Sequence, residues 1–197
     1  MSESDVLLNE ANKLFLKKHY RDAVPIYEKI LKLDSTNINA INNKGYALSK
    51  SKDYKDAIDC YNEGLRIKPN DKTLLINKIS ALRKMRALDE ALDTCNIILD
   101  DEPDNLIVLY HKIRILSMLE MYNESLDICS QILNMYPKNV DVLFERSRNY
   151  AQISNIPDCL LALESAINIS YEFKIKAKKD KAFESLSTRQ EFLKLVS

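Results

Sequence analysis

The chain has 197 residues and a balanced charge, with 29 lysines and arginines against 29 aspartates and glutamates. A net charge of zero gives no attraction to nucleic acid or to an anionic membrane, and two glycines could scarcely build a phosphate-binding loop. No apolar run approaches the roughly 20 residues of a membrane-spanning helix. With 46% apolar residues, the chain can still bury a substantial core.

The chain is organised in stretches of 34 residues, and the second of them, residues 38–71, shows the pattern best. Its first half places Ile41, Gly45 and Leu48 at i, i+4 and i+7, which is one face of an α-helix. Its second half repeats this spacing with a further set: Tyr54, Ala57, Ile58, Tyr61 and Leu65. The stretch therefore predicts two helices joined by a turn.

In chain order from Ser4, the same pattern occurs five times without insertion or deletion. The position of Ala57 holds a small residue in each of the four remaining copies: Ala23, Ala91, Ser125 and Cys159. The predicted helix pairs span residues 4–37, 38–71, 72–105, 106–139 and 140–173. Behind them, residues 174–197 carry apolar residues that suit a capping helix and tail on the last pair: Ile175, Ala177, Phe183, Leu186, Phe192 and Leu195.

A period of 34 residues with helix, turn and helix resembles the tetratricopeptide repeat (TPR) family. The best copy carries the likeness in Gly45, Tyr54, Ala57, Tyr61 and Pro69. The likeness extends over residues 4–173, about nine tenths of the chain. It implies an all-α fold, a right-handed superhelical solenoid of antiparallel helix pairs.

Two places depart from the family pattern. The family usually has glycine in the turn between the helices, where a positive φ is tolerated, whereas this chain has side chains there: Lys18, Lys52, Arg86, Glu120 and Ser154. These turns must adopt a conformation that a side chain tolerates or accept strain. The small place of Gly45 becomes Ile79 and Ile113 in the next two copies, which suggests wider helix spacing there.

In the family, one side of the first helices lines a concave groove that receives an extended peptide. An asparagine there can pair with a peptide backbone because its amide has both a donor and an acceptor. The resemblance implies these groove residues: Asn9, Asn12, Asn43, Tyr46, Asn77, Arg83, Lys84, Tyr110, His111 and Arg114. It also implies groove neighbours: Phe15, Asn42, Lys50, Met118, Phe144 and Arg148. The basic cluster of Arg83, Lys84 and Arg114 would suit an acidic group of the ligand.

The function expected from this resemblance is a non-enzymatic protein-interaction module or scaffold that binds an extended peptide segment of a partner. The alternative is an assembly subunit that associates with itself or with a folded partner through its ends or convex face. Apolar residues on the groove, such as Tyr46 and Tyr110, favour the first, whereas an exposed Phe192–Leu193 pair would favour the second. We expect a monomer, with self-association left open.

The sequence contains no recognisable pattern of catalytic, metal-binding or cofactor-binding residues. His19 lies at a turn and His111 in the groove, without a nucleophile at recognisable spacing. Asp141 and Glu145 in the groove argue against RNA as a partner. The four cysteines form no C-x-x-C pair: Cys60, Cys95, Cys129 and Cys159. Cys95 and Cys129 stand in the place of Tyr27 and Tyr61 and are expected to be buried. The cysteine usage is typical of a protein in the reducing cytoplasm. We therefore expect no enzyme activity, no cofactor, and neither nucleic acid nor membrane as a partner.

The charge is unevenly distributed along the chain. From Lys174 to the end, seven basic and three acidic residues give a net charge of +4, which leaves −4 for the rest. A run of this kind is usually a solvated helix face.

Overall fold

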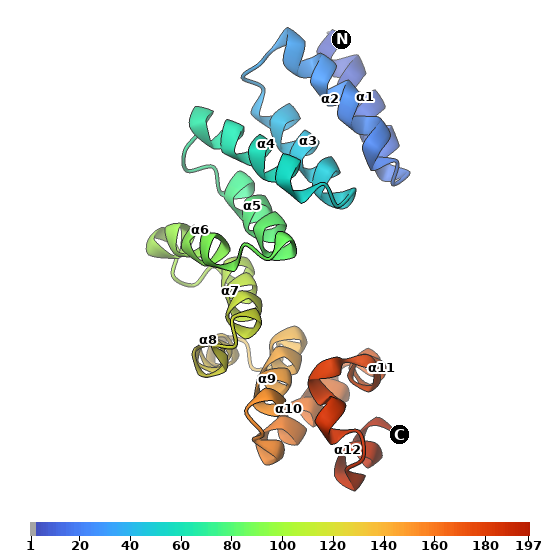
Figure 1. The fold of residues 1–197 in the computed structure, drawn as a ribbon, viewed down its shortest axis with the longest axis vertical. Coiled ribbons are helices and arrows are strands. Elements are labelled where there is room, and N and C mark those ends of the chain that lie inside the picture. Colours follow the sequence, from blue (N-terminus) through green and yellow to red (C-terminus); the bar gives the residue numbers. More distant parts are fainter. Residues whose placement is uncertain (1–2) are drawn as a thin grey trace. The chain divides into compact units, whose positions relative to one another are not determined.

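A computed structural model describes residues 3–197, and helices are the only regular secondary structure among these residues (Figure 1). The helices are α1 (Glu3–Leu16), α2 (Tyr20–Leu33), α3 (Ile38–Lys50), α4 (Tyr54–Ile67), α5 (Lys72–Met85), α6 (Leu88–Asp101), α7 (Leu106–Met118), α8 (Tyr122–Met135), α9 (Val140–Gln152), α10 (Ile156–Ile169), α11 (Glu172–Lys179), the 3-10 helix η1 (Lys181–Leu186) and α12 (Gln190–Val196). The predicted all-α fold class is confirmed.

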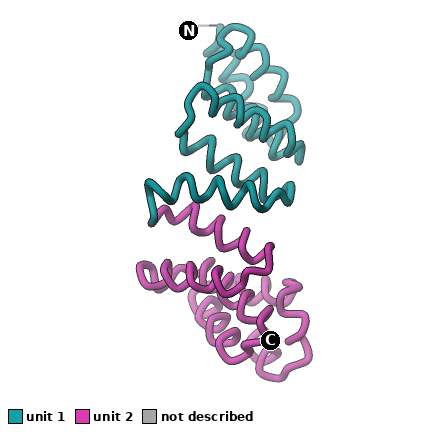
Figure 2. The backbone as a smooth tube through the Cα atoms, turned by 60° about the vertical axis from the view of Figure 1, so that its left-hand side comes forward, with its two compact units in different colours: residues 1–103 teal, residues 104–197 magenta. Residues whose placement is uncertain are grey.

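The chain forms two compact units, residues 1–103 and residues 104–197 (Figure 2). In unit 1, each helix from α1 to α6 packs against the next. In unit 2, α7 to α10 pack in the same sequential way, and η1, α11 and α12 then pack on α9 and α10. We propose that the five helix pairs are five repeats at the predicted boundaries and that residues 174–197 cap the last of them.

The first helices of successive pairs begin with the same cap. In α3, α5, α7 and α9, the side chain of the N-cap residue accepts a hydrogen bond from the backbone N–H three residues on, and these caps are Asn37, Asp71, Asn105 and Asn139. Each cap satisfies an N–H group that a helix start leaves unpaired, and such a cap is typically worth about 1 kcal/mol. The 34-residue period is therefore set partly by polar residues at the helix starts.

In the turn inside each helix pair, one non-glycine residue has its backbone in the left-handed region. The φ angle is positive at Lys18 (63°), Lys52 (72°), Arg86 (66°), Glu120 (63°) and Ser154 (60°). At Lys52, two backbone hydrogen bonds close the turn, from Lys52 N to Ser49 O and from Asp53 N to Leu48 O. This pair of bonds is a Schellman motif, and the other four turns have it too. Of the two alternatives left by the sequence, the structure shows the strained one.

At two facing positions inside the helix pairs, a small residue on one helix is matched by a large residue on the other. A Cβ atom on Gly45 would lie 2.7 Å from the ring of Tyr61, so the ring fills the space that a side chain would take. In the next pair the same two places hold Ile79 and Cys95, and both are fully buried. A large residue on one helix is thus matched by a small one on the other. This exchange explains how the isoleucine fits, and the wider helix spacing that the sequence suggested stays a prediction.

An aromatic cluster holds the C-terminal segment on α9. The ring of Phe144 lies 5.0 Å from Phe173 and 5.7 Å from Phe183, and Phe183 lies 5.8 Å from Phe192, measured between ring centroids. Phe144 is buried by these contacts, so its expected place on an open groove is wrong. Phe192 is buried as well, whereas Leu193 is 47% exposed. Only one residue of the expected exposed pair is therefore accessible.

Candidate functional site

Unit 1 has an open hollow of about 300 Å³ between its first helices α1, α3 and α5. A residue of the second helix α2, Tyr27, forms part of its floor. The other lining residues come from the first helices: Asn12, Phe15, Asn42, Asn43, Tyr46 and Asn77. The helical register explains this gathering, because the residues that do not pack on the second helix share one face.

The amides of this hollow form a chain of hydrogen bonds. Asn77 Nδ2 donates to Asn42 Oδ1 at 2.8 Å, and Asn42 Nδ2 donates to Asn43 Oδ1 at 3.5 Å. At the other end, the hydroxyl of buried Tyr27 donates to Asn12 Oδ1 at 3.4 Å. The chain holds the amides of α3 and α5 together on the wall of the hollow. A fixed amide is a good partner for a peptide group, since less side-chain freedom remains to be lost on binding.

An aromatic pair forms the apolar wall. Phe15 and Tyr46 are stacked, with ring centroids 5.4 Å apart, and Tyr20 meets Phe15 edge-on at 4.9 Å. Lys50 Nζ lies 5.1 Å from the centroid of the Tyr46 ring. The hollow therefore offers an apolar surface with a cation at its edge.

Positive charge gathers at one end of α5. Lys84 Nζ lies 5.8 Å from the ring centroid of Tyr54. Burial lowers the pKa of Lys84, and the neighbouring charges of Lys50 and Arg83 lower it further. These cations repel one another, so an anionic group placed among them would relieve the repulsion.

The structure brings four of the predicted groove residues together in this hollow: Asn12, Asn43, Tyr46 and Asn77. Asn9 is exposed on α1 and does not line it. Arg83 and Lys84 lie in the last turn of α5 and contribute the positive charge. Asn42 and Phe15, which were expected as groove neighbours, also line the hollow, and Asn42 completes the amide chain.

In unit 2, two of the predicted groove residues line a hollow, and the third forms an ion pair. Tyr110 and His111 line a hollow of about 240 Å³ with residues of the α7 and α9 starts, Leu106, Ile107, Asn139 and Asp141. Arg114 turns to Glu145 instead, and its Nε lies 3.3 Å from Glu145 Oε1. The predicted basic cluster is therefore reduced to the residues of unit 1, because Arg114 already has a carboxylate.

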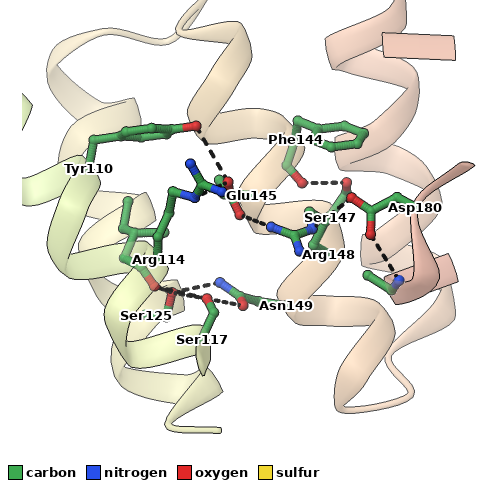
Figure 3. A network of polar contacts seen from close by, with 12 residues as sticks. Tyr110, Arg114, Ser117, Ser125, Phe144, Glu145, Ser147, Arg148, Asn149 and Asp180 are labelled. Carbon is green, nitrogen blue, oxygen red and sulfur yellow. Dashed lines mark hydrogen bonds and ion pairs between the residues drawn. The ribbon is translucent and has the colours of Figure 1, made fainter. Parts of the chain in front are cut away.

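Glu145 is the centre of a polar network (Figure 3). Arg148 Nη1 donates to Glu145 Oε2 at 2.6 Å, and the Tyr110 hydroxyl donates to Glu145 Oε1 at 3.4 Å. Arg148 Nε lies 3.0 Å from Asp180 Oδ2, which ties α9 to the loop before η1. Glu145 is only 4% exposed, so its expected place on an open groove surface is wrong. Its two arginines compensate the burial of its charge.

These charges shift the pKa values of the network. Burial raises the pKa of Tyr110 to about 12, with a further contribution from the Glu145 carboxylate. Burial by itself would lower the pKa of Arg148, but Glu145 and Asp180 outweigh it, and that pKa is raised. Arg148 was expected as a groove neighbour, and the structure uses it to hold the C-terminal segment.

A second polar cluster lies below the Glu145 network in the view of Figure 3. It was not predicted from the sequence. Ser117 Oγ donates to Asn149 Oδ1 and Asn149 Nδ2 donates to Ser125 Oγ, both at 2.6 Å. Ser125 Oγ in turn reaches Ile113 O at 3.1 Å. The available signal was a polar residue at a repeat position that is apolar in the three preceding repeats, where Ala47, Ala81 and Ile115 stand. The buried groups satisfy one another, so the cluster fixes the register of α7, α8 and α9.

The four cysteines are buried and form no disulfide. Burial raises the pKa of Cys60 to about 11 and that of Cys129 and of Cys159 to about 12. These thiols therefore stay protonated near neutral pH. Within residues 3–197, no group of His, Cys, Asp and Glu has a geometry that could hold a metal ion, and no described helix combines the length and apolarity needed to cross a membrane.

The sequential helix pairs define the class, an α-helical repeat protein. A family model of the tetratricopeptide repeat matches residues 38–71. The same fold occurs in PilW, a type IV pilus biogenesis factor (TM-score 0.80, 16% identity, 99% of this chain and 91% of that chain covered). It also occurs in MamA from Desulfovibrio magneticus RS-1 (0.74, 14%, 89% and 97%) and in YrrB (0.69, 23%, 88% and 91%). Residues 38–71 therefore match a tetratricopeptide repeat, and the chain has the fold of tetratricopeptide repeat proteins, which are protein-interaction modules and generally non-catalytic. No curated protein matches its sequence.

Proposed function

We propose that the chain is a scaffold that binds an extended peptide segment of a partner protein in the hollow of unit 1. The observation that carries this proposal is the row of hydrogen-bonded asparagine amides beside an open aromatic wall. YrrB is described as a TPR protein with an unusual peptide-binding site, which makes a peptide a reasonable ligand for this fold. The cytoplasm stays a prediction for its location.

The amides would bind the peptide backbone. The bond from Asn77 to Asn42 uses the Nδ2 of Asn77, and in the proposal its Oδ1 accepts from a peptide N–H. In the same way, Nδ2 of Asn43 donates to a peptide carbonyl. Each such hydrogen bond contributes about 0.5–1.5 kcal/mol, so two of them give weak binding and little sequence preference.

Side chains of the ligand would supply the preference. Phe15 and Tyr46 suit an aliphatic or aromatic residue, because their stacked rings present an apolar face at the hollow. Lys50, Arg83 and Lys84 suit an acidic residue further along the peptide. The proposed ligand is therefore an extended segment with an apolar anchor followed or preceded by aspartate or glutamate.

The test selects peptides from a random library displayed on phage against the purified full chain. The affinity of an enriched peptide is then measured by fluorescence anisotropy. Loss of two backbone hydrogen bonds in Asn43→Ala/Asn77→Ala should weaken binding by about 1–3 kcal/mol, which is roughly 5-fold to 150-fold. Asn134→Ala removes an exposed amide at the end of α8 and serves as the matched control.

The enriched peptides should contain an apolar residue near an acidic one. Equal affinity of the double variant and the wild-type chain, with unchanged circular dichroism melts, would contradict the proposal. Selection of peptides that lose binding only after substitutions in unit 2 would contradict it as well.

A further inference from the structure

The outward face of α11 combines lysines with exposed apolar residues. Tyr171, at the helix start, is 65% exposed and Ile175 is 49% exposed. Lys178 and Lys179 follow on the same face and are exposed. Lys174 Nζ lies 5.1 Å from the ring centroid of Tyr171 and adds its charge to this face. The opposite face is buried through Phe173 and Ala177.

The outward face of α6 has the complementary composition. Asp89, Asp93, Ile97 and Asp100 lie within an arc of about 80°, because successive helical residues are about 100° apart. All four are exposed, and Ile97 is 52% exposed. The helix contains no lysine or arginine at all.

Neither face is neutralised by its own surroundings. Within residues 3–197, no ion pair involves Asp89, Asp93 or Asp100 on α6. On α11, no ion pair among the described residues involves Lys178 or Lys179. The ion pair within this helix joins Lys176 to Glu172. Each face thus carries uncompensated charge around one exposed isoleucine.

We propose that α11 of one copy docks on α6 of a second copy of this chain. Lysines of α11 lie against aspartates of α6, and Ile175 and Tyr171 cover Ile97. The contact is heterologous, because the two surfaces differ. One contact leaves α6 of the first copy and α11 of the second copy free, so the association extends to chains or rings. A lipid surface fits α11 less well, since two apolar residues give little to insert.

The contact depends on few charges at exposed positions and is therefore weak. We expect a dissociation constant on the order of 0.1 mM in about 0.05 M salt, and its loss in about 0.5 M salt because the charges are then screened. Sedimentation velocity of the full chain over a range of concentrations measures both. This inference is independent of peptide binding in unit 1, since it uses other residues.

Charge reversal makes the test specific. Asp93→Lys/Asp100→Lys gives a chain with two basic faces, and Lys178→Glu/Lys179→Glu gives one with two acidic faces. Each variant alone should remain monomeric at concentrations where the wild-type chain associates. An equimolar mixture of the two should associate again, because opposite charges face each other at both contacts. Lys29→Glu/Lys32→Glu, at exposed positions of α2, is the control with the same charge change.

Several results would overturn the proposal. A wild-type chain that stays monomeric up to about 1 mM in low salt has no such contact. Association that persists in both single variants, or that the mixture does not restore, places the contact elsewhere. Binding of the wild-type chain to vesicles of anionic lipid that Lys178→Glu/Lys179→Glu abolishes, without self-association, would assign α11 to a membrane instead. Unchanged circular dichroism melts exclude misfolding as the cause in each case.

Discussion

The strained turns predict that glycine stabilises this protein where glycine usually destabilises. At Lys52 the φ angle is 72°, in a region that residues with a Cβ atom rarely adopt. The side chain is exposed and makes no hydrogen bond or ion pair within the described residues. Lys52→Gly therefore removes backbone strain without removing a contact, and the same reasoning applies at each of the other four turns: Lys18, Arg86, Glu120 and Ser154.

The magnitude follows from two opposing effects. A residue with a Cβ atom in the left-handed region lowers the free energy of unfolding by about 1–2 kcal/mol. Glycine avoids this cost, but its greater freedom in the unfolded chain lowers the free energy of unfolding by about 0.5–1 kcal/mol. Each substitution should then raise the free energy of unfolding by about 0.5–1 kcal/mol. The five turns lie 34 residues apart and share no partners. Their effects should add, to about 2.5–5 kcal/mol for the five-fold variant.

Urea unfolding followed by far-UV circular dichroism measures this gain. The matched control is Lys17→Gly, one residue before a strained turn, where φ is not positive and glycine should lower the free energy of unfolding. The reasoning would be refuted if Lys18→Gly and Lys17→Gly lowered the urea midpoint equally. It would also be refuted if the five-fold variant were no more stable than the wild-type chain.

Four further predictions follow from the buried residues. Gly45→Ala should lower the melting temperature, because the new Cβ atom would lie 2.7 Å from the Tyr61 ring and overpacking costs about 1–3 kcal/mol; an unchanged melt would show that the ring moves freely. Tyr61→Phe should raise the free energy of unfolding by about 1 kcal/mol, since the buried hydroxyl has no hydrogen-bond partner among residues 3–197, and a loss in urea unfolding would reveal such a partner. Glu145→Gln should destabilise unit 2 by about 1–3 kcal/mol, because it removes the buried carboxylate that Arg114 and Arg148 share, although Arg148 keeps Asp180; hydrogen exchange confined to unit 2 checks it, and equal protection in both proteins would contradict it. Burial raises the pKa of Cys129 to about 12, so the unfolded state loses its proton first and stability should fall as pH rises from about 9 towards 12; Cys129→Ala should show a shallower fall, and an identical slope would exclude this thiol.

The fold could be predicted because it depends on local and periodic features. The 34-residue period places a polar cap before the first helix of pairs two to five, as at Asn37 and Asp71, and small or apolar residues at fixed offsets behind it. These features act within a few residues of one another. A sequence shows them directly, so the helix pairs follow from the sequence with little ambiguity.

The hollow of unit 1 was predictable in part for the same reason. The helical register assigns Asn12, Asn43, Tyr46 and Asn77 to the face that does not pack on the second helix. The register does not show which side chains bond one another, so the link from Asn77 to Asn42 required the structure.

Unit 2 shows where the register fails. Glu145 occupies the same place in its repeat as Asn77 in an earlier one, yet it is buried, because Arg148 on its own helix and Arg114 on α7 reach its carboxylate. Phe144 is buried because residues 173–183 come back over α9. The contacts of Arg114 and of residues 173–183 come from distant parts of the chain, and the repeat pattern contains no information about them.

The most direct test of the peptide-binding proposal is an NMR titration of the full ¹⁵N-labelled chain with a selected peptide, following the side-chain amide signals of the asparagines. The proposal predicts that the signals of Asn12, Asn43 and Asn77 shift together and saturate at one peptide per chain. The signal of Asn134, on α8, should stay in place. Shifts confined to unit 2, with the amides of the hollow unchanged, would contradict the account.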